Sequence, residues 1–229
     1  MGDDYVHRTA ITCLEVTDEQ RDLLEETISE WKRGCQLATD MAWGKYNAKS
    51  DVQPLAYNDV RECTDLGSQH AILATHQAAK AITGCIERKA KDKKVSKPTF
   101  TAPTVKYDTR TMTVFDDDTV SLSTTESRVR CDLALPDADD GYQRQYLDSD
   151  NWSVTESTLT VRDGDYFLLV DFRVEPSVYY SFKTMKQSNN FVAIVERVLN
   201  WLGVIHFLHD SKINEQRDVR MNRLSTDAS

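Results

Sequence analysis

Seven lysine and arginine side chains lie close together between residues 80 and 97, in the sequence KAITGCIERKAKDKKVSK. With two acidic residues among them, this segment has a net charge of +5, which leaves −14 on the rest of a chain whose total is −9. An acidic chain repels polyanions, so a cluster of this sign indicates a surface that binds phosphate groups of nucleic acid. A solvated helix end, where the helix dipole favours cations, is the alternative explanation. The candidate phosphate-binding residues are Lys89, Lys91, Lys93, Lys94 and Lys97.

Other kinds of chemistry find little support in the chain. It contains no Gly-x-x-x-x-Gly-Lys loop, no Gly-x-Ser-x-Gly elbow and no dinucleotide-binding fingerprint, so we predict no catalytic residue and no cofactor. The five cysteines are scattered and form no Cys-x-x-Cys pair, which predicts buried thiols in a reducing compartment and no metal site. The first residues have neither a basic nor an apolar signal region, so we expect a cytoplasmic protein.

Aspartate accounts for 25 of the 37 acidic residues. Aspartate hydrates well but forms helices and strands poorly, so its excess favours a surface adapted to concentrated salt, as in a halophilic archaeon. At about 1 M salt the Debye length is only ~3 Å, so the repulsion between these charges would be mild. A generic acidic surface is the alternative.

The first hundred residues predict one strand followed by a helical block. Residues 5–16 alternate as a strand does, and TDEQ at 17–20 is typical of a capping box that begins a long helix ending near residue 45. Pro54 is expected to break the pattern, so that a short helix begins near Asn58 and a longer one spans residues 65–91. We therefore expect residues 17–97 to form a helical insertion.

From residue 98 the hydrophobic period changes from helical to alternating, with short β-branched segments between turn formers. Asp163-Gly164 predicts a type I′ hairpin turn between the last two strands. Residues 1–16 and 98–176 are thus expected to form one β-barrel of six to seven strands, which makes the fold class α+β.

Residues 177–229 begin as a polar linker and continue as an apolar helix over residues 191–208. Glu196 and Arg197 make a membrane span costly, at roughly 2.5–3.5 kcal/mol for each central charge. We predict a C-terminal helix that packs on protein, and no membrane partner.

Several segments together resemble the TnpB proteins, the RNA-guided nucleases carried by insertion sequences and also called OrfB transposases. The matching segments are LGSQHAILATHQAAKAITGCIERKAKDKKVSKPTF, with its Leu-x-x-Gln helix start and final Lys-x-Pro-x-Phe, and VKYDTRTMTVFDDDTVSL. The resemblance covers residues 5–176 and is strongest to haloarchaeal members. It implies a wedge domain, residues 1–16 and 98–176, interrupted by a recognition domain, residues 17–97. It also implies two partners, a guide RNA from the end of the element and double-stranded DNA.

The same resemblance implies a set of DNA-contacting residues. In the family, a short motif beside the guided site is read by recognition-domain side chains and by the strand after the basic loop. The matching positions are Tyr57, Gln69 and Tyr107, with Thr109 and Arg110 in the following turn. A helix-lining role for Gln69 and a core role for Tyr57 remain alternatives. Asp65 stands where the family has a base-contacting lysine.

After residue 176 the resemblance ends. The family continues into a RuvC-like nuclease with three metal-binding carboxylates and a zinc ribbon, and no matching Gly-x-Asp-x-Gly or Cys-x-x-Cys pattern occurs here. Mg²⁺ and Zn²⁺ would be needed only by those absent domains, so we expect a fragment that binds RNA and DNA without cutting. One alternative is a subunit of a split nuclease completed by a downstream nuclease fragment. Another is a barrel-plus-helix interaction protein that binds no nucleic acid.

Overall fold

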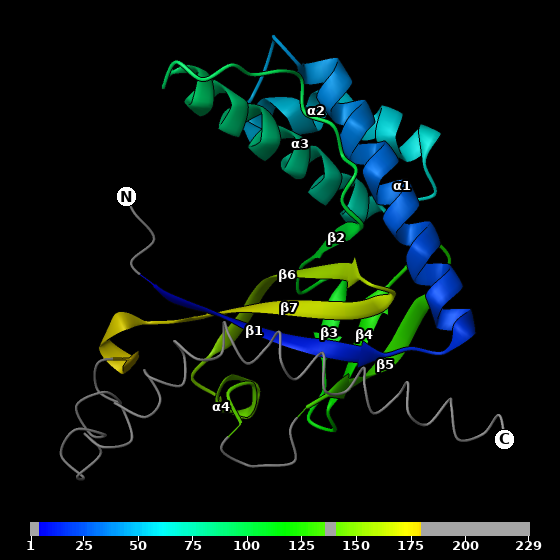
Figure 1. Cartoon of the computed structure of the whole chain (residues 1–229), viewed down its shortest axis with the longest axis vertical. Coiled ribbons are helices and arrows are strands. Elements are labelled where there is room, and N and C mark those ends of the chain that lie inside the picture. The colour runs from blue at the N-terminus through cyan, green and yellow to red at the C-terminus, as the bar shows by residue number, and fades with distance from the viewer. Residues whose placement is uncertain (1–4, 136–140, 180–229) are drawn as a thin grey trace, which may run out of the picture. The chain divides into compact units, whose positions relative to one another are not determined.

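The computed structural model describes residues 5–135 and 141–179 (Figure 1). Contacts divide the chain into two units, Met1–Val174 and Glu175–Ser229. Of the second unit only the first residues are described, where the amide of Tyr179 donates to the carbonyl of Glu175. The predicted helix at 191–208 and most of the segment 177–229 lie outside the described residues.

The described part of the first unit is α+β, as predicted, with four helices and seven strands. The helices are α1 (Asp18–Ala42), α2 (Lys49–Cys63), α3 (Ser68–Lys89) and α4 (Arg144–Leu147). The strands are β1 (Val6–Glu15), β2 (Thr104–Tyr107), β3 (Met112–Val114), β4 (Thr119–Ser123), β5 (Arg128–Ala134), β6 (Ser153–Arg162) and β7 (Asp165–Val174). Within the described ranges, no helix combines the length and apolar composition needed to cross a bilayer.

The start of α1 is fixed by the predicted capping box, which the structure confirms. Thr17 Oγ1 accepts a hydrogen bond from the Gln20 amide at 3.3 Å, and Gln20 Oε1 accepts from the Thr17 amide at 2.8 Å. The Gln20 side-chain amide also donates to the carbonyl of Arg130 on β5 at 2.7 Å. The cap therefore also ties the first helix to the sheet.

The helix boundary predicted at Pro54 is wrong, because Pro54 lies inside α2. A proline lacks the amide that would bond to the carbonyl four residues earlier, so the helix loses one hydrogen bond there. Val52, Ala56 and Val60 repeat once per turn and are fully buried. Burial of these three side chains compensates for the missing hydrogen bond. The local sequence alone does not reveal that they are buried.

Gly34 on α1 packs closely against side chains of α2, α3 and the connection between them. A Cβ atom at this position would stand 2.9 Å from Leu66 Cδ1 and 3.2 Å from Val60 Cγ1. Small residues on α3 serve the same close packing, since Ala71, Ala74 and Ala78 are fully buried. Leu73 and Ala81 on the same helix are only half-buried. The buried face of α3 also includes residues 75 and 82.

We expect Gly34→Ala to lower the free energy of unfolding by about 1–2 kcal/mol, because a fully buried Leu66 must shift to admit the methyl group. The matched control is Gly84→Ala on α3, where an added Cβ meets nothing within 4 Å. There the better helix propensity of alanine should stabilise the protein by up to about 1 kcal/mol. Urea unfolding followed by circular dichroism measures both changes, and stabilisation by Gly34→Ala would contradict the packing described.

The seven strands form one antiparallel sheet in the order β2-β6-β7-β1-β5-β4-β3. The first strand, β1, is central and pairs with β7 from Val6↔Val174 to Leu14↔Tyr166, and with β5 on its other side. The β6–β7 turn has Asp163 at φ 52° and Gly164 at φ 88°, which confirms the predicted type I′ hairpin.

The sheet is curled into a half-barrel. Its two edge strands, β2 and β3, are consecutive in the chain and are joined by residues 108–111 alone. A connection of this length spans at most about 18 Å, so the two edges must lie near each other. The number of strands is as predicted. The edge strands β2 and β3 do not pair with each other in the described sheet, so the barrel is not closed.

Aromatic side chains connect the helical block to the sheet. The ring of His70 on α3 meets that of Tyr107 on β2 edge-to-face, with centroids 5.1 Å apart, and that of Trp31 on α1 at 6.2 Å. All three side chains are buried. This contact holds the start of α3 against the edge of the sheet.

Candidate nucleic-acid interface

The basic segment begins at a well-defined helix end. The amide of Lys93 donates to the carbonyl of Arg88 and that of Asp92 to the carbonyl of Lys89, both at 3.0 Å, which is the Schellman pattern. Asp92 takes the left-handed conformation, with φ 54°, at the position where glycine is most common. Aspartate tolerates this conformation better than most residues, so the backbone that carries the lysines has a definite path.

The chain that follows the lysines is held along α1. The side chain of Gln36 donates to the carbonyl of Pro98 at 3.5 Å and accepts from the amide of Phe100 at 3.4 Å. Lys97 Nζ lies 2.8 Å from Asp40 Oδ1. The Lys-x-Pro-x-Phe sequence thus anchors the far end of the basic loop.

The four lysines between these anchors are exposed. Lys89, Lys91, Lys93 and Lys94 all lie on the surface. Within the described part of the chain none of them forms an ion pair, in contrast to Lys97. Their charges are therefore available to a polyanion. The charge of Lys97 is partly neutralised by Asp40.

A second group of predicted residues gathers where α3 begins. Gln69 Nε2 donates to Asp108 Oδ2 at 2.6 Å, and Arg110 Nη1 donates to Gln69 Oε1 at 3.2 Å. The other oxygen of Asp108 accepts from the amides of Arg110 and Thr111, both at 3.0 Å. The turn after β2 and the first turn of α3 are therefore joined by one hydrogen-bond network.

Asp108 is the centre of this network. Partial burial raises the pKa of its carboxyl, but hydrogen bonds from the Thr111 hydroxyl, two backbone amides and Gln69 outweigh that effect, so the pKa lies below its ordinary value. Asp108 is therefore ionised near neutral pH and holds the turn closed.

These contacts change the roles expected for Gln69 and Arg110. Both polar atoms of the Gln69 amide are engaged in the free protein, so Gln69 positions Arg110. Arg110 is exposed and uses one of its five guanidinium donors on Gln69. The remaining donors suit two acceptors of a guanine edge or a phosphate. Thr109, next to it, is also exposed.

Tyr107 and Tyr57 do not join this group as expected. Tyr107 is completely buried, so its side chain is inaccessible to a nucleic acid, and burial raises the pKa of its phenol. We therefore correct its predicted role to one in the core. Tyr57 is half-buried on α2 and packs against the core, with part of its surface exposed.

The predicted site residues thus form two groups at opposite ends of α3. The 22 residues of this helix are roughly 30 Å long. Figure 1 shows α3 running from the edge of the sheet to the loop that follows it. Gln69 is the second residue of this helix, and the lysines lie at and beyond its end. One side chain cannot serve both ends, so a ligand that contacts both groups must be extended.

Two residues of this region escaped the sequence analysis. Asp108 had a local signal, since its spacing to Thr111 is typical of a turn closed by the two side chains. Arg128 on β5 donates to Ser121, Ser123 and the carbonyl of Arg110, which supports the turn from an interior strand of the sheet. Its partners lie on β4 and in the turn after β2, and nothing in the local sequence indicates them.

No protein-family model matches the chain, and no curated protein matches its sequence. Among the described residues, no group of three or more histidine, cysteine, aspartate or glutamate side chains is placed to hold a metal ion.

Proposed function

We propose that this chain is an N-terminal portion of a TnpB-like, RNA-guided DNA-binding protein, which binds a guide RNA and duplex DNA without cutting either. The observation that carries the proposal is a set of four exposed lysines, Lys89, Lys91, Lys93 and Lys94, which form no ion pair with any described residue. They lie on a chain whose other residues sum to a strongly negative charge. On an acidic protein, such a surface attracts polyanions that the rest of the chain repels.

The order of the elements supports the same proposal. One strand precedes three helices, and the remaining strands then complete a sheet in which that first strand is central. This is the arrangement expected of a wedge domain interrupted by a recognition domain. The proposal gives the loop lysines the phosphate contacts and gives Arg110 a contact with DNA at the other end of α3.

The direct test measures binding by electrophoretic mobility, with RNA transcribed from the end of the element that carries the gene. We expect affinity at least in the micromolar range and a log–log salt slope of about −4 if five phosphates are contacted. Adding Mg²⁺ and matching duplex DNA should give a retained duplex without cleavage. Absence of RNA binding at any salt, or cleavage by the purified chain, would contradict the proposal.

A further inference from the structure

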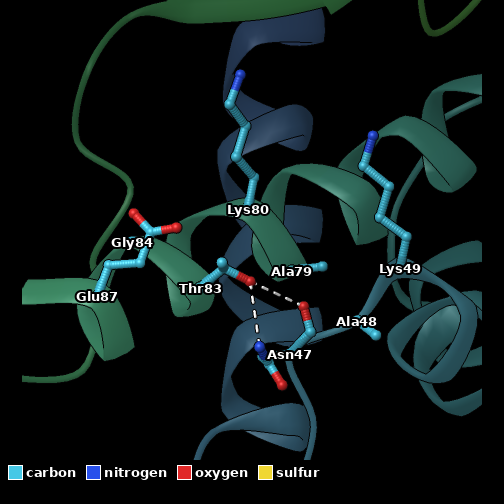
Figure 2. A pocket seen from close by; sticks show the side chains of 8 residues that line it. All are labelled: Asn47, Ala48, Lys49, Ala79, Lys80, Thr83, Gly84 and Glu87. Atoms are coloured by element: carbon cyan, nitrogen blue, oxygen red, sulfur yellow. Dashed lines mark hydrogen bonds between the residues drawn. The ribbon is translucent and has the colours of Figure 1, made fainter. Parts of the chain in front are cut away.

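Between the start of α2 and the second half of α3 lies an open groove of about 580 Å³. Such a volume is within the range of sites that hold small ligands or parts of larger ones. Its lining includes Asn47, Lys49, Lys80, Thr83, Gly84 and Glu87. In Figure 2, Lys49 and Lys80 extend toward the same side of the view from two different helices, and Thr83 and Asn47 lie below them.

Two lining residues are unfavourable for the helices that contain them. Lys49 is the first residue of α2, where the helix dipole disfavours a cation. Gly84 lies inside α3, at a cost of about 1 kcal/mol relative to alanine, yet an added Cβ would meet nothing within 4 Å. Packing therefore explains neither residue. Local rules broken without structural compensation are typical of a functional site.

The groove offers charges of both signs that the protein does not use. Neither lysine forms an ion pair within the described residues, nor does Glu87. Thr83 is already engaged, because its hydroxyl donates to the carbonyl of Asn47 at 3.0 Å. Two cations and one carboxylate therefore remain for a ligand with an anionic and a hydrogen-bond-donating part.

Ribonucleotides have this combination of groups. A phosphate fits between two lysines, and the ribose 2′-hydroxyl donates to a carboxylate, which DNA cannot do. The glycine admits a sugar–phosphate backbone close to the helix. Tyr46, which precedes Asn47 and is 45% exposed, offers a face on which a base can stack.

We propose that this groove binds one strand of RNA, with a phosphate between Lys49 and Lys80 and a ribose hydroxyl on Glu87. The inference rests on the proposed function and adds two points to it. The bound strand is RNA, and its backbone runs beside α3. Glu87 is then the residue that distinguishes RNA from DNA.

The test compares two fluorescein-labelled oligoadenylates of about 12 nucleotides, one RNA and one DNA, by fluorescence anisotropy. The wild type should bind RNA roughly fivefold more tightly than DNA, as expected for one hydrogen bond. Glu87→Ala should bring this ratio near one. The ratio is informative because the lost negative charge strengthens the binding of both strands alike.

Further variants separate this inference from the proposed function. Gly84→Gln should fill the groove and weaken RNA binding about as much as Lys49→Ala combined with Lys80→Ala. Arg162→Ala removes an exposed cation from the β6–β7 hairpin and should leave the RNA-to-DNA ratio unchanged. Melting curves confirm that each variant is folded.

If the wild type binds both strands equally, or if Glu87→Ala leaves the ratio intact, the groove inference is overturned while the lysine-loop proposal stands. If inorganic phosphate or free adenosine monophosphate binds in the groove but the oligomer does not, the inference is also overturned. If the wild type binds no nucleic acid at all, the proposed function itself fails.

Discussion

Replacing Lys91, Lys93 and Lys94 together by alanine is expected to weaken duplex DNA and RNA binding by roughly two to three orders of magnitude near 0.1 M salt. All three side chains are exposed and form no ion pair in the described part of the chain. Each phosphate contact with duplex DNA contributes about 0.9 to the log–log salt slope, so the slope should become shallower by about 2.7. Filter binding over a series of salt concentrations measures both quantities.

Two controls distinguish contact by the loop from a general effect of charge. Arg162→Ala removes one exposed cation from the β6–β7 hairpin and should change affinity little. Asp92→Asn removes the one anion within the lysine run, and asparagine tolerates the left-handed conformation at least as well. It should therefore strengthen binding. An unchanged salt slope in the triple variant would show that the loop does not contact phosphates.

Acidification from pH 6.5 to pH 4 is expected to destabilise the protein through His70 by about 3 kcal/mol. Burial lowers the pKa of His70 to about 4, against a weaker opposing effect of Asp108. Between these pH values the unfolded chain binds a proton on this side chain and the folded chain does not. Stability is therefore fully present above the unfolded pKa and is lost as the pH falls toward the folded one.

Urea unfolding at a series of pH values measures this loss, and His70→Phe is the informative variant. Phenylalanine keeps the edge-to-face contacts with Trp31 and Tyr107 and removes the titration. It also removes a buried ring nitrogen, Nε2, that has no hydrogen-bond partner among the residues the structure describes. The variant should show a flatter stability profile between pH 4 and 6.5. An equally steep profile in the variant would assign the loss to other groups, and His70→Leu checks the result if phenylalanine is too large.

Features that local chemistry decides were predictable from the sequence. The capping box at Thr17 depends only on two residues three positions apart. The turn at Asp163-Gly164 depends only on two adjacent residues. The exposure of the loop lysines follows from the cost of burying charges. The burial of Tyr107 could also have been predicted, because it shares a face of β2 with the buried Val105.

Features that depend on distant partners were not predictable. Pro54 is tolerated in α2 because Val52, Ala56 and Val60 are buried against other helices, a gain that the local sequence does not show. The amide of Gln69 suits a base edge by type, yet it is engaged by Asp108, which lies 39 residues away. The family resemblance indicated which positions belong to the region. Their roles depend on tertiary hydrogen bonds.

The central position of β1 has a consequence for how the chain acquires its structure during synthesis. Its principal partner, β7, is the last strand of the sheet. During synthesis, β1 therefore cannot complete this pairing until residue 174 has left the ribosome. The three long helices between them make mostly local contacts and can assemble first. A nascent chain stopped before β7 would leave one side of β1 without a partner, and an unpaired strand of this kind promotes self-association.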